Sequence, residues 1–511
     1  MTPAGQDGSS PLDTARRDEL RGRSVRSGFV QLGAQMGQLV VMVASGMVLA
    51  RLLTPADFGL LAMVTAITGL GYKIQHFGLP QAAVQHDEFS EEQAAALFWR
   101  TIELTAVGAL GMALSAPLMV RFYEEPRLAL IVLVFALAFA VRGLTAVHES
   151  VLMRRLRFGV LAAANLTAWT VGAAVGIALA WAGFGYRALV VQALVFAGVH
   201  TAMIWWRVEW RPGPRPPWSG EGGMASLLRY GSNLTGYRVL EYIARNMDRV
   251  LVGVVQGPQS LGFYDAAYRW SSYPMMQIAT PLANVALAGL ARVRHDPDAY
   301  RRSCRSGFLP LFSVLLPALV FFVVEAERTI FLLLGDQWGP AIPLFRILCV
   351  AGIGYSVTQV TKWLFLVEGK TGRQVRWGFF YLPVMALCIV SGSPWGARGV
   401  AIGFAVGTWL TMPTAVWAAL RDSTLRQRDL YAVALRPATA AVVAAAATLL
   451  LDVVRPGAIV GVGGAQTLVR QLMVFGVVFL GAWLSIPGGR DRLREVVELL
   501  RSALPGSPRR V

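Results

Sequence analysis

Charged residues recur every three or four positions within an apolar stretch of this 511-residue chain. Between residues 230 and 255 they are Arg238, Glu241, Arg245, Asp248 and Arg249. Residues at this spacing share one face of a helix. An ionisable side chain inside a bilayer is costly unless it faces a protein interior or a wet cavity. The spacing therefore predicts a polar track between membrane helices.

Two chemistries fit this track. Pairs of Glu241 with Arg245 and of Asp248 with Arg249 would form an ion-pair ladder that only holds helices together. However, three arginines against two carboxylates leave a surplus positive charge, which favours an anionic ligand. A guanidinium group binds phosphate with two parallel hydrogen bonds, and aromatic faces pack on sugar rings. The track thus predicts a site for a phosphate-bearing, hydroxyl-rich ligand.

Two later apolar stretches, 259–290 and 340–366, carry side chains of the same kinds. Asp265 and Arg269 lie one helical turn apart and can pair. Glu241 and Asp265 are the candidates for proton or sodium coupling. The predicted cationic cavity is lined by Arg238, Arg245, Arg249, Arg269, Lys362, Tyr268, Tyr355 and Gln359. In the first half of the chain, Lys73, Arg100 and Arg142 are predicted to lie nearer a membrane surface.

Membrane-spanning helices must position these residues. The chain is 55% hydrophobic and only 15% charged, and about 20 apolar residues cross a hydrocarbon core of about 30 Å. We predict an all-α polytopic membrane protein with about fourteen transmembrane helices. The predicted spans are 27–50, 56–78, 94–119, 127–147, 159–182, 186–207, 230–255, 259–290, 305–328, 340–366, 374–394, 398–420, 432–453 and 465–487.

The distribution of basic residues predicts the orientation. Even-numbered connections and both tails hold about 30 Lys and Arg residues, and odd-numbered connections about 8, so the positive-inside rule places both termini in the cytoplasm. The net charge of +17 is explained by these cytoplasmic loops. We therefore expect no nucleic-acid partner.

The sixth connection is rich in Pro and Gly and divides the spans into two sets, so it reads as an inter-lobe hinge. Pro55 and Pro258 each precede a glycine by four residues, at Gly59 and Gly262, just after an apolar span. This match indicates an internal duplication, although Pro and Gly also favour interhelical turns in general. The predicted regions are a cytoplasmic tail 1–26, an N-lobe 27–207, a linker 208–224, a C-lobe 225–420, two further helices 421–487 and a basic tail 488–511.

Nothing in the sequence predicts metal, cofactor or catalysis. Cys304, Cys349 and Cys388 form no C-x-x-C pair, and the five histidines are scattered. No nucleophile-base constellation or phosphate-cradling loop is present. We expect a protein that is not an enzyme.

Four phrases carry a resemblance to a known family: LARLLTPADFG at 49–59, NMDRVLVG at 246–253, LGFYDAAYR at 261–269 and LGDQW at 334–338. Together they resemble the polysaccharide-transporter, Wzx-like flippases of the multidrug, oligosaccharidyl-lipid and polysaccharide exporter superfamily. The resemblance covers residues from about 25 to about 430.

This resemblance implies two six-helix lobes around a central cationic cavity, plus two C-terminal helices whose groove takes a lipid tail. It implies alternating access that moves an undecaprenyl-diphosphate-linked oligosaccharide to the outer leaflet of the bacterial inner membrane, for lipopolysaccharide or exopolysaccharide synthesis. The implied partners are this lipid-linked oligosaccharide, membrane lipids and the glycan polymerase machinery. In such a mechanism, the turns at Pro55 and Pro258 are expected to form the outer gate.

Two other functions remain open. A multidrug or cation antiporter of the same superfamily would favour an acidic and aromatic pocket, whereas the predicted tracks are net basic. A membrane glycan polymerase or ligase would need a sizeable extracytoplasmic loop, whereas the odd-numbered connections are short.

Overall fold

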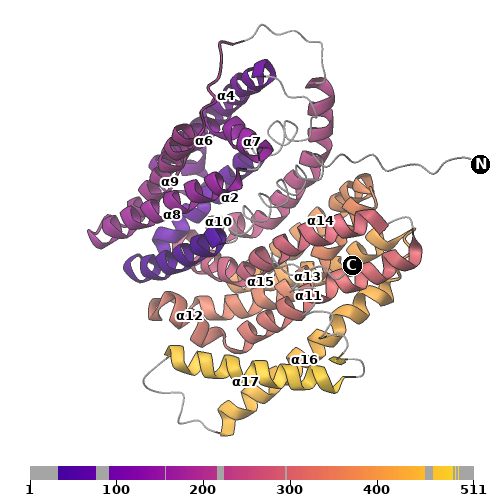
Figure 1. Cartoon of the computed structure of the whole chain (residues 1–511). Coiled ribbons are helices and arrows are strands. Elements are labelled where there is room, and N and C mark those ends of the chain that lie inside the picture. The colour runs from indigo at the N-terminus through magenta and orange to yellow at the C-terminus, as the bar shows by residue number, and fades with distance from the viewer. Residues whose placement is uncertain are drawn as a thin grey trace, which may run out of the picture.

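The computed structural model describes residues 33–75, 91–155, 157–215, 224–293, 296–454, 464–486, 489–490 and 493. These residues form helices joined by turns, and none of them lies in a strand. Figure 1 shows two bundles, one coloured indigo to magenta and the other pink to orange, with the yellow helix α17 at the edge of the second. The all-α class is confirmed. Nearly all of the two predicted tails lies outside the described residues.

The first bundle corresponds to the predicted N-lobe. Its helices are Gly33–Leu52, α2 (Pro55–Gln75), α4 (Glu91–Leu114), α5 (Ala116–Tyr123), α6 (Leu128–Gly143), α7 (Ala146–Arg154), α8 (Phe158–Trp181) and α9 (Tyr186–Arg207).

Small residues bring α8 and α9 together. The buried residues of α8 include Ala164, Ala168, Gly172, Gly176 and Ala180, each four positions after the last. A Cβ on Gly172 would lie 3.3 Å from a backbone oxygen of α9. Because lipid tails are as apolar as a protein core, membrane helices associate mainly through such close packing.

The second bundle corresponds to the predicted C-lobe. Its helices are α10 (Met224–Val293), α11 (Pro297–Val324), α12 (Ala326–Leu334), η1 (Asp336–Trp338), α13 (Ala341–Val367), α14 (Thr371–Gly392), η2 (Ser393–Trp395) and α15 (Gly396–Leu420). Gly257 interrupts α10 with φ +75° and ψ −175°. A residue with a side chain rarely adopts that positive φ, so a glycine stands at the point where the chain leaves one helix and begins the next.

Glycines also join α14 to α15. Gly399, Gly403 and Gly407 follow one another at four-residue intervals, and a Cβ on Gly403 would lie 2.1 Å from the carbonyl oxygen of Cys388. The final helices, α16 (Gln427–Val454) and α17 (Gly464–Ser485), pack mainly on α11, on α12 and on each other. They contribute no lining to the cavities described below.

Ten helices among the described residues are long and apolar enough to cross a membrane. One of them, Gly372–Leu420, comprises α14 and α15 and so contains two predicted spans. The charged helix α10 is not among the ten, although it covers two more predicted spans. The multi-pass architecture is confirmed, and the count of fourteen stays a prediction.

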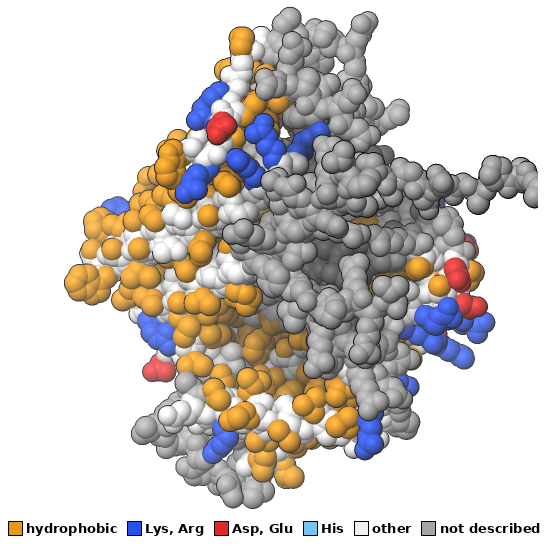
Figure 2. Space-filling view, in the orientation of Figure 1, with side chains coloured by type: hydrophobic (Ala, Val, Ile, Leu, Met, Phe, Trp, Pro, Cys, Tyr) orange, Lys and Arg blue, Asp and Glu red, His pale blue; other side chains and the backbone are white. Residues whose placement is uncertain are grey.

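Apolar side chains cover much of the molecular flank in Figure 2. On α4, the exposed residues Leu104, Val107, Leu110 and Leu114 recur at three or four positions, which makes one continuous stripe. Such a stripe would be unfavourable in water and suits contact with lipid tails.

The predicted linker is anchored to the N-lobe over its first half. The Trp210 ring packs 5.0 Å from that of His148, and the Trp99 indole donates to the carbonyl oxygen of Gly213 at 3.0 Å. Arg215 forms an ion pair with Glu103. Residues 216–223 of the predicted linker lie outside the described residues, and the inter-lobe hinge stays a prediction.

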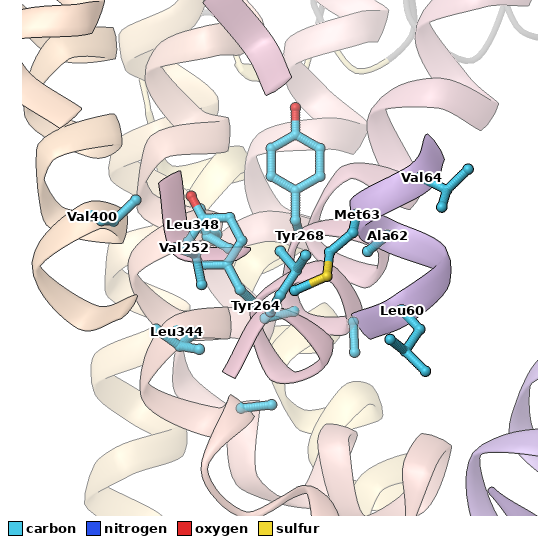
Figure 3. Packing of buried hydrophobic residues seen from close by; sticks show 14 of the residues in the cluster. Leu60, Ala62, Met63, Val64, Val252, Tyr264, Tyr268, Leu344, Leu348 and Val400 are labelled. Carbon is cyan, nitrogen blue, oxygen red and sulfur yellow. The ribbon is translucent and has the colours of Figure 1, made fainter. Parts of the chain in front are cut away.

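One hydrophobic core links the two lobes. It combines residues of α2, α10, α13 and α15, and Figure 3 shows Met63 of α2 beside Tyr264 and Tyr268 of α10. Trp338, fully buried, packs its ring 5.4 Å from Phe58. Its indole donates to the carbonyl oxygen of Ala50 at 2.9 Å, so the C-lobe is bound to the end of the first N-lobe helix.

Candidate functional site

Arg245 is surrounded by phenols. Its Nη2 and Nε donate to the Tyr268 hydroxyl at 2.8 Å and 3.3 Å, and its Nη1 donates to the Tyr355 hydroxyl. The guanidinium carbon lies 4.6 Å from the centre of the Tyr355 ring. Among the described residues, no carboxylate lies within ion-pair distance of Arg245. Its charge is thus stabilised by hydroxyls and an aromatic face, and remains available to an anion.

Tyr355 connects Arg245 to an ion pair between α10 and α13. Lys362 pairs with Glu241 and donates to the Tyr355 hydroxyl at 2.7 Å. That hydroxyl donates to Glu241 at 3.4 Å. A phenol has one donor and can accept two hydrogen bonds, so the two cations and the carboxylate satisfy Tyr355 fully.

A second charged group lies on the other side of Tyr268. Asp265 pairs with Arg249 at 3.2 Å and with Arg269 at 2.7 Å. The Arg249 guanidinium carbon lies 4.3 Å from the centre of the Tyr268 ring. The predicted pair of Asp265 with Arg269 is therefore present, and Asp265 also holds a second arginine.

The ion-pair ladder of Glu241 with Arg245 and Asp248 with Arg249, considered for the first half of α10, does not form with these partners. Glu241 pairs directly with Lys362 of α13 instead of Arg245. Asp248 accepts a hydrogen bond from Tyr264 at 2.7 Å, and the direct ion pair of Arg249 is with Asp265. Helix packing therefore pairs these side chains with partners further along the chain than the predicted ones.

Three cavities adjoin this network. The first, of about 140 Å³, is lined by Arg245, Tyr268, Tyr355 and Gln359 within the C-lobe. The second, of about 340 Å³, lies between the first N-lobe helix and α10 and is lined by Arg249, Arg269 and Tyr268. The third, of about 430 Å³, reaches into the N-lobe.

Shared walls connect the three cavities. Tyr268, Ser272 and Met276 line both the first and the second, and Gln192 and Arg269 line both the second and the third. A row of cavities therefore runs from the C-lobe into the N-lobe. This row of cavities passes the Tyr268 hydroxyl and the cations Arg245, Arg249 and Arg269.

The structure brings together most of the predicted site residues. Six of them line a cavity: Arg245, Arg249, Arg269, Tyr268, Tyr355 and Gln359. Lys362 lies behind Tyr355 as its hydrogen-bond donor and lines none of the three cavities. The backbone of Arg238 belongs to α10, but its side chain lies outside the described residues.

The N-lobe wall contains residues that the sequence did not mark as site residues. Arg142, expected near a membrane surface, lines the third cavity and lies 5.4 Å from the Phe196 ring centre. Trp169 and Gln192 line the second and third cavities. The signal for Gln192 was its place as a single amide in an otherwise apolar segment. By contrast, Arg100 pairs with Glu103 at 2.7 Å, and the side chain of Lys73 lies outside the described residues.

The net charge of the network is positive. Four cations, Arg245, Arg249, Arg269 and Lys362, face the three carboxylates of Glu241, Asp248 and Asp265. Guanidinium groups bind phosphate well, and the tyrosine and tryptophan rings offer flat surfaces. The arrangement can hold a phosphate-bearing ligand between the lobes.

Comparison with known proteins identifies relatives across most of the chain. A family model described as polysaccharide biosynthesis protein matches residues 48–343. The lipopolysaccharide biosynthesis protein WzxC of Escherichia coli is 24% identical over 386 residues, which cover 73% of this chain and 77% of that protein. The succinoglycan biosynthesis transport protein ExoT of Rhizobium meliloti is 25% identical over 408 residues, which cover 78% of this chain and 80% of that protein.

The fold matches a solved transporter. The lipid II flippase MurJ, in an inward closed conformation, superimposes with a TM-score of 0.70 at 12% identity, over 91% of this chain and all of that one. At this identity, the match establishes the two-lobed fold alone.

Proposed function

Because this chain belongs to the family of polysaccharide biosynthesis proteins, we propose that it is a flippase for lipid-linked oligosaccharides. It moves an undecaprenyl-diphosphate-linked unit from the inner to the outer leaflet of the bacterial inner membrane. The names of its relatives point to lipopolysaccharide biosynthesis and to succinoglycan transport. We infer that the glycan polymerase machinery on the outer side consumes the translocated unit.

The observation that carries the proposal is the environment of Arg245. A buried cation is stable only when its charge is compensated. Among the described residues, Arg245 is compensated in part by the phenols Tyr268 and Tyr355, the second also through its ring face, and no carboxylate pairs with it directly. A diphosphate that enters the cavity would supply the missing negative charge. A cationic drug would meet repulsion instead, which argues against the multidrug antiporter.

The route follows from the row of cavities. The diphosphate and sugars would occupy the polar space beside Tyr268, while the lipid tail stays in the bilayer. Alternating access requires that the lobes open to each side in turn. We propose Arg245, Tyr268, Tyr355 and Gln359 as headgroup contacts, and Arg249 and Arg269 as contacts further toward the N-lobe.

Transport in proteoliposomes tests this proposal. An undecaprenyl-diphosphate-linked oligosaccharide is placed in one leaflet, and its arrival in the other is followed with an impermeant lectin. Arg245→Ala should lower the rate at least tenfold, and Arg245→Lys should recover part of it, because charge remains while the bidentate fork is lost. Arg398→Ala is the control, because that arginine is exposed and lines none of the three cavities.

Equal transport by wild type and Arg245→Ala, at equal abundance in the membrane, would reject Arg245 as a substrate contact. Extrusion of cationic dyes without any oligosaccharide movement would instead favour the antiporter. For the proposed orientation, reporter fusions at Arg215 and Gly457 should give cytoplasmic and external signals respectively, and the same signal at both would overturn the topology.

A further inference from the structure

A groove separate from the central cavities lies where α14 begins and α15 ends. It encloses about 600 Å³ and is lined by Arg373, Arg376, Trp377, Phe380, Thr414, Trp417, Ala418, Arg421 and Asp422. None of these residues lines the cavities beside Arg245. The groove is therefore not part of the proposed transport path.

The groove is positively charged. Its three arginines face a single carboxylate, that of Asp422, which accepts a hydrogen bond from Arg373 at 2.9 Å. The Arg421 guanidinium carbon lies 5.4 Å from the Trp417 ring centre, and neither Arg421 nor Arg376 lies within ion-pair distance of a carboxylate among the described residues. Two guanidinium groups thus remain available to an anion.

The wall of the groove is aromatic and fixed. The Trp377 ring stacks on Tyr381, with ring centres 4.9 Å apart, and its indole donates to the Thr414 hydroxyl at 3.2 Å. Phe380 and Trp417 are about half exposed, at 49% and 54%. Tryptophan beside arginine is the usual pattern where a membrane helix meets the lipid headgroups.

Exposed apolar side chains lie further along the same two helices. On α14 and α15 they are Phe379, Leu387, Val390, Ile402, Val406 and Leu410. Arg376 and Leu387 are eleven positions apart, or about 16 Å along a helix, which is about half of a 30 Å hydrocarbon core. The surface has the length and polarity of one lipid, with its head at the arginines and its tails on the apolar face.

The position of the groove indicates which leaflet its ligand comes from. The groove lies between the tenth and twelfth connections, which the distribution of basic residues assigns to the cytoplasm. Basic pockets between membrane helices on that side bind anionic lipid headgroups. Lys and Arg side chains also gather at the right-hand edge of the C-lobe in Figure 2.

We propose that this groove is a binding site for an acidic phospholipid of the inner leaflet. Arg376 and Arg421 bind the phosphate, Trp377 and Trp417 flank the glycerol region, and the acyl chains lie on the exposed face of α14 and α15. The lipid holds the cytoplasmic ends of these two helices together, next to the helix α13 that carries Tyr355.

Native mass spectrometry of the full-length protein tests the site. Phosphatidylglycerol and phosphatidylcholine with identical chains are titrated against the wild type and against Arg376→Gln/Arg421→Gln. The wild type should prefer phosphatidylglycerol, and the double variant should bind it roughly tenfold to thirtyfold more weakly, because each basic residue near an anionic headgroup contributes about fivefold. Both residues are exposed, so the variant should fold.

The matched control is Arg302→Gln/Arg428→Gln, which removes the same charge from exposed sites outside the groove. It should change the affinity less than twofold. An equal loss in the control, or no loss in the groove variant, would overturn the proposal in favour of a general effect of charge.

Two competitors separate the other sources of phosphate. Undecaprenyl phosphate should not displace phosphatidylglycerol from the groove at equal concentration, and inorganic phosphate should not displace it in millimolar excess. Displacement by undecaprenyl phosphate would reassign the groove to the transported substrate. Displacement by inorganic phosphate would reassign it to a soluble anion, and either result would refute the phospholipid site.

Discussion

Gly59 of α2 packs its backbone directly against Pro258 of α10: a Cβ on Gly59 would lie 1.7 Å from the carbonyl oxygen of Pro258. The contact is reciprocal, because a Cβ on Gly262 would lie 1.8 Å from the carbonyl oxygen of Pro55. The matched turns of the two lobes therefore interlock, as expected for lobes related by duplication. Only glycine fits at either position, so the close contact between the two turns depends on both glycines.

Gly59→Ala should open the lobes on the side of these turns. The added methyl group cannot share space with the Pro258 carbonyl, so the equilibrium shifts away from the closed state. A single cysteine at Ser272, which lines two of the cavities, reports the change in an otherwise cysteine-free chain. Its labelling by an impermeant thiol reagent added outside should accelerate roughly tenfold, which corresponds to about 1.4 kcal/mol.

Gly198→Ala is the matched control for this experiment, since a Cβ there meets nothing within 4 Å. It should leave the labelling rate unchanged. If Gly59→Ala labelled no faster than this control, the interlocked turns would not be the outer closure.

A disulfide between the two turns should lock that closure. Ala56 and Gln259 directly follow the prolines that contact the opposite glycines. Cysteines at both positions, in a chain without its native cysteines, should cross-link under mild oxidation and stop transport, and a reductant should restore it. Efficient cross-linking with undiminished transport would show that the lobes need not separate at these turns.

Trp338 should contribute strongly to stability. Its ring is fully buried between Phe58 and Phe263, with ring centres 5.4 Å and 6.0 Å away. Trp338→Ala should cost about 3–5 kcal/mol because it leaves a large cavity. Trp338→Phe keeps the aromatic contacts and loses the hydrogen bond to Ala50, at about 1 kcal/mol.

Thermal unfolding of the purified protein in detergent measures both variants. Trp181→Ala provides the control, because that tryptophan is 83% exposed. A Tm for Trp338→Ala equal to that of the control would mean that the packing between the lobes around Trp338 adds little to stability.

Glu241→Gln tests ion coupling. The carboxylate pairs with Lys362 and accepts from Tyr355, so a proton bound there would free a positive charge beside the cavity. If Glu241 carries the coupling proton, wild-type transport should depend on a pH gradient, and Glu241→Gln should transport at the same rate with or without one. Glu327→Gln, at an exposed position on α12, should respond like wild type. A Glu241→Gln protein that still follows the gradient would exclude this residue.

The helices and their shared chemistry can be predicted from the amino-acid sequence. Apolar segments of spanning length can satisfy their backbone hydrogen bonds in lipid only as helices or closed barrels, and the lengths here fit helices. The spacing of charges along residues 230–255 also predicts that one face of α10 is polar. For this reason residue type and helical spacing could select Arg245, Tyr268 and Tyr355 as candidates, and the structure places all three around one cavity.

Tertiary packing decides which charges pair. It also decides which charge, that of Arg245, is left without a direct carboxylate partner among the described residues. Glu241 and Arg245 lie one turn apart, yet Lys362, 121 positions along the chain, takes the carboxylate. Helix spacing shows which side chains share a face, but the helix opposite that face is chosen by packing of small residues and by the shape of the core. For the same reason, the close approach of Gly59 to Pro258 could not be predicted. A glycine in a sequence does not show which backbone will lie against it.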